Sequence, residues 1–322
     1  MKYRQLGNSD LKVSVVGLGG NTYGPPRIDQ EMTSRNMHHA QELGINFVDT
    51  AAGYGRGESE AYIGNALKDR SSDWIIATKF NLRNREEGES VRDRIFKHCE
   101  TSLAKLQTDC IDLYQNHFPD QSVSAEEVLE PLAELVQQGK VRYIGESNYA
   151  AWRHMQMLEL AKRTGGPEMV SSQNHYNILR RHVELEVLPF CAANNVGFLP
   201  YFPLGGGYLT GKYVPGKPAP EGTRGAAGSP IVTRTRSERN EALLPQLEQY
   251  AKDHGHSVLE LAFAWLVAHP QVSSVIAGQS SPEQVEANAK SADWEMTPEE
   301  LEELNEVAAW DGSGERVEGG GM

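Results

Sequence analysis

The sequence is poor in cysteine. Its 322 residues include only three cysteines, Cys99, Cys110 and Cys191, which lie far apart and form no CxxC pair. A secreted fold held by disulfides and a cysteine-rich zinc site are therefore not expected. No apolar run reaches the roughly 18 residues that a membrane span needs, and the start of the chain, MKYRQLGNSD, lacks the apolar core of a secretory signal. These absences predict a cytoplasmic protein with reduced thiols.

Positive charge is also scarce. The chain has 31 lysines and arginines against 44 aspartates and glutamates, which gives a formal net charge of −13. Nucleic acids and anionic membranes bind basic faces, so neither is expected as a partner. No HxH pair follows an early strand, as a metal-dependent barrel hydrolase would require, and no metal site is predicted. The charge leaves the number of subunits open.

What the sequence does have is a regular alternation of short apolar runs and helical segments. Residues 3–6 and 11–13 flank a Gly-Asn-Ser-Asp turn and predict an N-terminal β-hairpin. Eight later runs predict strands over 15–18, 45–48, 75–78, 111–114, 141–144, 169–171, 197–199 and 274–277. Each of the first seven precedes a segment with helical spacing, and Asp29 and Ser281 are predicted helix starts.

Eight strand–helix units form either a closed barrel or an open, doubly wound sheet. An open sheet that binds a dinucleotide usually has GxGxxG between its first strand and a helix. Here residues 16–20 read Val-Gly-Leu-Gly-Gly, but no helix is expected before Asp29. The sequence therefore predicts an α/β protein: one (β/α)8 barrel over residues 1–310, with the N-terminal hairpin and two extra helices.

Three segments lie outside the simple repeat. Residues 211–236 are rich in glycine, proline and alanine and predict a long mobile loop that acts as a lid. Residues 237–253 and 297–310 are the predicted extra helices. Residues 311–322, mostly glycine and charged residues, predict a disordered tail.

Polar residues gather at the predicted carboxyl ends of the strands, where barrel enzymes carry their active sites. They are Asp49, Lys79, Asn116, His117, Ser147, Asn148, Gln173, Asn174 and Tyr201. Charged and amide side chains are seldom buried for stability alone. Their concentration at successive strand ends therefore predicts an active site.

Four residues suggest acid–base chemistry. Tyr54 follows Asp49 in a glycine-bordered loop, and a phenol has a reference pKa of about 10. A nearby ammonium lowers that pKa, and Lys79, held by Asp49, is the candidate. His117 would orient a carbonyl oxygen while Tyr54 protonates an alkoxide. Taken singly, the residues have structural interpretations: an internal ion pair for Asp49 and Lys79, a packing role for Tyr54 and a core histidine for His117.

Several longer motifs carry a family resemblance. They are residues 49–54, Thr78-Lys79, Leu-Tyr-Gln-Asn-His at 113–117, Gly-Glu-Ser-Asn at 145–148, Gln173 with Tyr176-Asn177, Pro-Leu-Gly-Gly-Gly at 203–207, and 209–213. Over almost its full length the chain resembles the aldo-keto reductases, including the branch that contains the potassium-channel β subunits. The resemblance implies a catalytic tetrad of Asp49, Tyr54, Lys79 and His117, with Tyr54 as proton donor.

The resemblance also implies a nicotinamide cofactor that lies across the barrel mouth without a Rossmann motif. Ser147, Asn148 and Gln173 would hold the carboxamide, and Tyr201 would stack on the nicotinamide ring. The implied cofactor contacts are Gly19, Asn21, Asp49, Ser147, Asn148, Gln173, Tyr201, Phe202, Pro203, Leu204, Gly205, Lys212, Arg224, Gly278, Ser280, Gln284 and Asn288.

Two positions depart from the family pattern. Phe202 stands where a serine usually precedes the Pro-Leu of the pyrophosphate loop, so a hydroxyl contact is lost and backbone N–H groups remain. Residues 278–284 contain no basic residue for a 2′-phosphate, whereas the channel-β branch uses a lysine and an arginine of the lid, and here Lys212 and Arg224 are the candidates. Charge-assisted hydrogen bonds of about 1.5–3 kcal/mol each would then favour NADP(H), with NAD(H) as the alternative.

The resemblance predicts an oxidoreductase that transfers hydride between NADP(H) and a small aldehyde, ketone or sugar carbonyl, or in reverse from an alcohol. The alternative is an NADPH-binding regulatory subunit with slow turnover. The sequence leaves the particular substrate and the physiological direction open.

Overall fold

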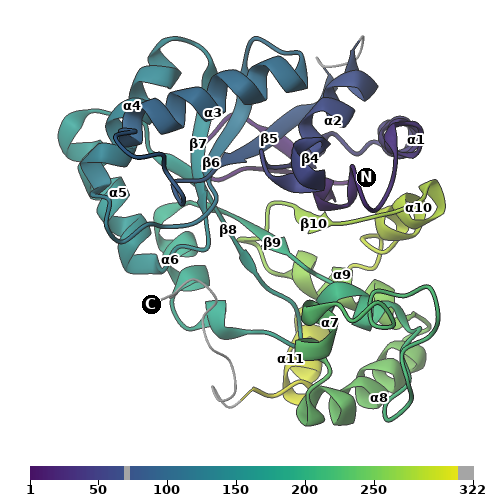
Figure 1. The fold of residues 1–322 in the computed structure, drawn as a ribbon. Helices are drawn as coiled ribbons and strands as arrows, with labels where there is room; N and C mark the ends of the chain where they lie inside the picture. Colours follow the sequence, from purple (N-terminus) through teal and green to yellow (C-terminus); the bar gives the residue numbers. More distant parts are fainter. Residues whose placement is uncertain (69–72, 311–322) are drawn as a thin grey trace.

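A closed barrel of eight parallel strands forms the centre of this computed structural model, which describes residues 1–68 and 73–310 (Figure 1). The strands are β3 (Val16–Gly19), β4 (Phe47–Asp49), β5 (Ile75–Phe80), β6 (Ile111–Asn116), β7 (Val141–Ser147), β8 (Met169–His175), β9 (Gly197–Tyr201) and β10 (Val275–Ala277). β10 closes the barrel against β3, with Ile276 paired to Gly17. The predicted (β/α)8 barrel is confirmed. The predicted disordered tail, 311–322, lies outside the described residues.

Helices surround the barrel (Figure 1). Each of α1 (Gln30–Glu42), α2 (Ser59–Leu67), α3 (Val91–Leu106), α4 (Ala125–Gln137), α5 (Ala151–Thr164), α6 (Val187–Asn194) and α10 (Pro282–Lys290) follows a strand, and α9 (Val258–Ala268) precedes β10. The predicted extra helices are confirmed as α8 (Glu238–Asp253) and α11 (Pro298–Val307). Asp29 caps α1, since its carboxylate accepts the Met32 N–H at 2.9 Å. α10 begins directly after Ser281, as predicted.

The segment predicted as a mobile lid, 211–236, is only partly a loop. A short helix, α7 (Pro230–Thr235), forms near its end and starts at a proline, which suits the first helical position. Its Ile231 and Val232 pack on Gly206, where an added Cβ would lie 2.9 and 3.1 Å from their side chains. The prediction of a continuous loop was therefore wrong here, because the glycine and proline content hid two apolar residues that pack on a neighbouring loop.

An apolar layer fills the amino-terminal end of the barrel interior. Its strand residues are Phe47, Ala77, Leu113, Val170, Leu199 and Ile276. The hairpin of β1 (Tyr3–Gln5) and β2 (Lys12–Ser14) closes this end with Leu6, Leu11 and Val13, all buried in the same cluster. Burial of each such side chain contributes about 1.5–3 kcal/mol. The charged side chains of the interior, Asp49 and Lys79, lie above this layer, towards the carboxyl ends of the strands.

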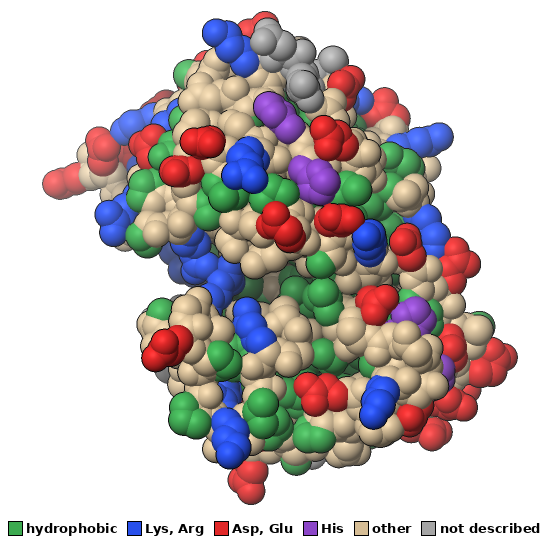
Figure 2. Space-filling model, turned by 90° about the vertical axis from the view of Figure 1, so that its right-hand side faces the viewer, with side chains coloured by type: hydrophobic (Ala, Val, Ile, Leu, Met, Phe, Trp, Pro, Cys, Tyr) green, Lys and Arg blue, Asp and Glu red, His purple; other side chains and the backbone are tan. Residues whose placement is uncertain are grey.

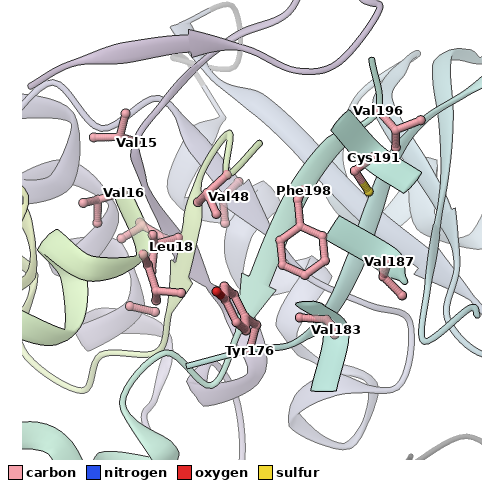
Figure 3. Packing of buried hydrophobic residues seen from close by; sticks show 14 of the residues in the cluster. Val15, Val16, Leu18, Val48, Tyr176, Val183, Val187, Cys191, Val196 and Phe198 are labelled. Atoms are coloured by element: carbon pink, nitrogen blue, oxygen red, sulfur yellow. The ribbon is translucent and has the colours of Figure 1, made fainter. Parts of the chain in front are cut away.

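A second apolar core lies between the strands and the helices. The strand residues that alternate with the inward-facing ones, such as Val48 and Phe198, point outwards into this core. The Phe198 ring meets that of Tyr176 edge to face at 5.8 Å and lies near Val187 and Cys191 of α6 (Figure 3). Because successive strand residues face opposite sides, this core and the apolar layer inside determine which polar residues face the barrel mouth.

Candidate active site

Polar side chains form the layer above the apolar one, at the carboxyl ends of the strands. They follow apolar inward residues at a spacing of two: Asp49 after Phe47, Lys79 after Ala77, Gln115 after Leu113 and Tyr201 after Leu199. β5, β7 and β8 extend further than predicted, because their last residues still pair with the neighbouring strands. Lys79, Ser147 and Gln173 therefore lie within strands, where the backbone holds them.

Lys79 and Asp49 form a buried ion pair. The Lys79 Nζ lies 2.6 Å from the Asp49 Oδ2 and also donates to the Thr50 carbonyl at 2.9 Å. Their side chains are 0% and 3% exposed. The other carboxylate oxygen, Oδ1, accepts hydrogen bonds from Gln115 at 3.1 Å and Gln173 at 2.8 Å. Three donors thus fix the carboxylate, and the carboxylate fixes the ammonium.

Gln115 is a site residue that the sequence analysis missed. That analysis placed Asn116 in the polar set, but the Asn116 side chain faces outwards and donates to the Tyr149 hydroxyl at 2.8 Å. The two-residue repeat of a strand could have identified Gln115, because Gln115 lies two residues after the inward-facing Leu113 and Asn116 lies three residues after it.

Tyr54 begins a short 3-10 segment, η2 (Tyr54–Gly57), in the loop after β4. Its hydroxyl lies 3.4 Å from the His117 Nε2, and the two rings meet edge to face. The Lys79 Nζ lies 5.2 Å from the centre of the Tyr54 ring. Gly55 makes this turn possible: its φ is 57°, and a Cβ there would lie 2.1 Å from the Tyr23 carbonyl oxygen.

Burial controls the protonation of these groups. Desolvation, followed by the charge of Asp49, raises the pKa of Tyr54 above its ordinary value. The predicted lowering of the Tyr54 pKa is therefore wrong, because burial and, after it, the Asp49 charge raise that pKa. Burial, with Lys79 and Arg83 as further causes, lowers the pKa of His117 to about 3. Near neutral pH the site presents a neutral phenol and a neutral imidazole.

A buried carboxyl group supports β5 from the helix side. Glu60 of α2 is 1% exposed and accepts the Thr78 hydroxyl at 2.6 Å. Burial raises the pKa of Glu60. Because Thr78 directly precedes Lys79, this bond helps to hold the strand that carries the ammonium. The sequence analysis missed Glu60, since a lone glutamate in a helix gives no signal before the packing is known.

Asn148 connects the His117 loop to β9. Its φ of 64° is left-handed, a conformation that asparagine adopts more readily than most residues other than glycine. Its amide nitrogen donates to the His117 carbonyl at 3.0 Å, and its amide oxygen accepts the Tyr201 hydroxyl at 2.7 Å. The Ser147 hydroxyl donates to the Gln173 carbonyl at 2.9 Å. These bonds hold several predicted contact residues in one rigid patch.

A cavity of about 340 Å³ opens above the ion pair, and its lining includes Asp49, Tyr54, His117, Ser147, Asn148, Gln173, Tyr201, Gly19 and Asn21. An adjoining groove of about 520 Å³ shares Phe202, Pro203, Arg224 and Gly278 with it and continues past Leu204, Lys212, Ser280, Gln284 and Asn288. All the residues predicted from the resemblance thus line one continuous depression, except two. Lys79 lies beneath the cavity floor, and Gly205 is buried beside the groove.

Three cations line the groove without a carboxylate partner. Arg27, Lys212 and Arg224 form no ion pair with any carboxylate of residues 1–68 and 73–310. Burial and the charge of Arg27 lower the pKa of Arg224 to about 10. Figure 2 shows a hollow across one face of the molecule with basic side chains at one end. Clustered cations repel one another unless an anion joins them. Arg27 was not predicted, because basic residues were expected only after the last strand and in the lid.

The groove also has space beside two glycines and a hydrogen-bond acceptor that has no partner. Gly206 and Gly207 have left-handed φ values of 72° and 102°, and a Cβ on Gly207 would lie 3.3 Å from the Lys212 Nζ. Asn21 has a buried Oδ1 with no hydrogen-bond partner among the described residues, 3.0 Å from where a Cβ on Gly278 would stand. These features fit an extended ligand that carries phosphates and hydrogen-bond donors.

Among residues 1–68 and 73–310, no three His, Cys, Asp or Glu side chains are grouped so that they could hold a metal ion. None of the helices in that part of the chain has the length and apolar character needed to cross a membrane.

The profile of the Aldo/keto reductase family matches residues 15–309. The chain is 34% identical to the putative voltage-gated potassium channel subunit beta of Schizosaccharomyces pombe, over 95% of this chain and 92% of that protein. It is 31% identical to the aldo-keto reductase YhdN of Bacillus subtilis, over 95% and 93% of the two chains. It is also 31% identical to the versiconal hemiacetal acetate reductase of Aspergillus parasiticus, over 95% and 96%. The chain belongs to the aldo/keto reductase family of oxidoreductases.

Proposed function

We propose that this protein is an NADP(H)-dependent oxidoreductase that interconverts a small aldehyde, ketone or sugar carbonyl and the corresponding alcohol. The observation that carries the proposal is the meeting of Tyr54 and His117 in the cavity, directly above the buried pair of Lys79 and Asp49. A general acid must lie within hydrogen-bond reach of the oxygen that it protonates. The Tyr54 hydroxyl and the His117 Nε2, 3.4 Å apart, can both reach one carbonyl oxygen.

Tyr54 is the proposed proton donor. A reduced nicotinamide, when bound, supplies the hydride that a carbonyl carbon accepts. Tyr54 then gives its hydroxyl proton to the oxygen, which is favourable because an alkoxide is a stronger base than a phenolate. Lys79, 5.2 Å from the ring centre, stabilises the negative charge left on Tyr54. His117 is neutral because of its low pKa, and it orients the oxygen without competing for the proton. In the alcohol-oxidising direction, the ionised form of Tyr54 accepts the proton of the alcohol.

NADP(H) is proposed over NAD(H) because of the three unpaired cations in the groove. A 2′-phosphate carries two negative charges near neutral pH, and arginine binds such groups with paired hydrogen bonds. Arg224 is half-buried in the groove and close enough to Arg27 for that charge to lower its pKa, so it is the best candidate for this contact. Gly206 and Gly207 leave room for the pyrophosphate.

The test of the proposal is Tyr54→Phe. We expect this variant to bind NADPH as the wild type does, measured by quenching of protein fluorescence. Its kcat/KM for an aldehyde should fall by at least about 100-fold, because a positioned general acid contributes that much. The matched control is Tyr143→Phe, because Tyr143 lies at the other end of the barrel, where its hydroxyl accepts the Asp10 N–H. Retention of wild-type turnover by Tyr54→Phe would remove the proposed acid.

A second candidate is an NADPH-binding regulatory subunit with slow turnover. The observation that favours it is the similarity to the fission yeast protein whose name describes a potassium channel subunit. A panel of aldehydes, ketones and sugars assayed by NADPH oxidation separates the two. Tight NADPH binding with negligible turnover of every compound would favour the regulatory subunit, and rapid turnover of any of them favours the reductase.

A further inference from the structure

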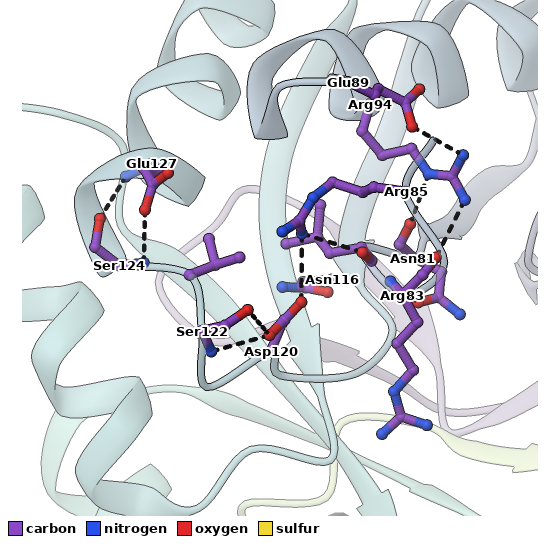
Figure 4. A network of polar contacts seen from close by, with 12 residues as sticks. Asn81, Arg83, Arg85, Glu89, Arg94, Asn116, Asp120, Ser122, Ser124 and Glu127 are labelled. Atoms are coloured by element: carbon purple, nitrogen blue, oxygen red, sulfur yellow. Dashed lines mark hydrogen bonds and ion pairs between the residues drawn. The ribbon is translucent and has the colours of Figure 1, made fainter. Parts of the chain in front are cut away.

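The loop after β5 carries Arg83 and Arg85, and Arg94 of α3 contacts this loop. Arg85 lies 3.3 Å from Asp120, and Arg94 lies 3.3 Å from Glu89. Arg83 forms no ion pair with any carboxylate in the part of the chain that the structure describes. Figure 4 shows its side chain extending away from this network, with no contact drawn to its guanidinium. Arg83 is therefore an exposed arginine without an acidic partner among the described residues, although the protein has a net charge of −13.

The loop holds the backbone of Arg83 in place. The Arg83 N–H donates to the Asn81 Oδ1 at 2.8 Å, and the Arg83 carbonyl accepts the Arg94 Nη2 at 3.2 Å. Asn84, the next residue, has a left-handed φ of 57°. Because the ion pair with Glu89 fixes Arg94 in turn, the position from which the Arg83 side chain leaves the loop is well defined. Arg83 therefore differs from a lysine or arginine on an unconstrained surface.

The guanidinium of Arg83 lies over an aromatic ring of the cavity wall. Its central carbon is 4.5 Å from the centre of the Phe118 ring, and Phe118 lines the cavity. The Phe118 ring stacks on the imidazole of His117 at 4.3 Å with an interplanar angle of 9°. Only one aromatic ring thus separates the unpaired positive charge from the imidazole that faces Tyr54.

We propose that Arg83 selects carbonyl substrates that carry an anionic group, a carboxylate or a phosphate ester, a few bonds from the carbonyl. The inference rests on the proposed reductase function and names the class of substrate. With the carbonyl oxygen at Tyr54 and His117, a short chain that passes around the edge of the Phe118 ring brings its anionic end towards the guanidinium. Arginine binds such groups with two parallel hydrogen bonds. The attraction also raises the rate of encounter with anions, which the acidic surface elsewhere repels.

The test compares each anionic aldehyde with a neutral partner of similar size. Succinic semialdehyde and its methyl ester form the carboxylate pair, and glycolaldehyde phosphate and glycolaldehyde form the phosphate pair. The measured quantity is the ratio of kcat/KM for the anionic compound to that for its neutral partner. We expect Arg83→Met to lower this ratio about tenfold in at least one pair, chiefly through KM, which corresponds to one charged hydrogen bond. Arg83→Lys, which keeps the charge, should retain most of the ratio.

The matched control is Arg92→Met. Arg92 also lies over a phenylalanine, 4.2 Å from the Phe96 ring centre, but it is on the surface of α3 and pairs with Glu134 at 2.7 Å. This variant should leave the ratio unchanged. The wild-type ratio should also fall as salt is added, because salt screens exposed charges.

The outcomes separate this inference from the proposed function. Reduction of neutral and anionic aldehydes with a ratio that Arg83→Met does not change would overturn the role of Arg83 and leave the reductase intact. Failure to reduce any of the four compounds, with NADPH bound, would count against the reductase itself and the inference with it. A larger change in one pair identifies carboxylate or phosphate as the preferred group.

Discussion

Removal of the Lys79 ammonium should destabilise this protein strongly. Lys79→Met keeps most of the side-chain volume but leaves the Asp49 carboxylate buried without its cation. Two amide donors, Gln115 and Gln173, would remain on one carboxylate oxygen. The other oxygen would lose its bond of 2.6 Å, at a place where the side chains are 0% and 3% exposed.

The magnitude follows from the cost of an uncompensated buried charge. Breaking a buried pair by removing one partner typically costs about 3–5 kcal/mol, whereas exposed pairs contribute about 1 kcal/mol or less. We therefore expect Lys79→Met to lower the free energy of unfolding by about 3–5 kcal/mol. The control, Lys162→Met, removes an exposed ion pair with Glu159 and should change it by less than about 1 kcal/mol.

Urea unfolding at neutral pH, followed by circular dichroism, measures both changes. Asp49→Asn and the double variant with Lys79→Met complete a double-mutant cycle. Because the double variant has no buried charge at these positions, it should be more stable than the sum of the single changes predicts, by about 1–3 kcal/mol. A loss below about 1 kcal/mol for Lys79→Met, or strict additivity, would show that the pair is not coupled as its geometry implies.

Three other outcomes are expected. Because the pKa of His117 is about 3 in the folded protein and about 6.5 in an unfolded chain, only the unfolded chain takes up this proton between those pH values. Stability should therefore fall as the pH falls, and His117→Gln should reduce that slope by up to about 1.4 kcal/mol per pH unit in urea titrations. Arg224→Gln should weaken NADPH binding by about tenfold or more and NADH binding far less, whereas Lys217→Gln on the same loop should alter neither in fluorescence titrations. Gly55→Ala should lower both kcat and thermal stability, because its Cβ would meet a backbone oxygen at 2.1 Å. Gly53→Ala, with nothing within 4 Å, should behave as the wild type in the same assays.

The barrel and its closing hairpin were predictable because both depend on local patterns. Apolar runs at regular spacing, the cap at Asp29 and the missing helix after residues 16–20 are all visible in the sequence. The short helix α7 was not, because its apolar residues become meaningful only when they pack on Gly206. Helix formation there depends on tertiary contact more than on propensity.

The candidate site, like the fold, was predictable from the sequence only in part. The motifs pointed to Tyr54, Lys79 and their neighbours, because strand ends meet at one mouth in any such barrel. To choose between Gln115 and Asn116, one must know which of two successive strand residues faces the interior. A short apolar run in the sequence does not define that well. Arg27 required knowledge of which loops lie together. The raised pKa of Tyr54 required the burial of the whole cluster, which no spacing in the sequence encodes.

The pairing of β3 with β10 has a consequence for how the protein is made. Asp49, Lys79 and His117 leave the ribosome early, whereas Arg224 and Gly278 emerge only after most of the chain has been synthesised. A nascent chain therefore carries this charge pair in a barrel that lacks its last wall until residues 275–277 pair with 16–18. Until that moment the ammonium and carboxylate remain accessible to water, so the pair becomes buried only when the two distant parts of the chain have met.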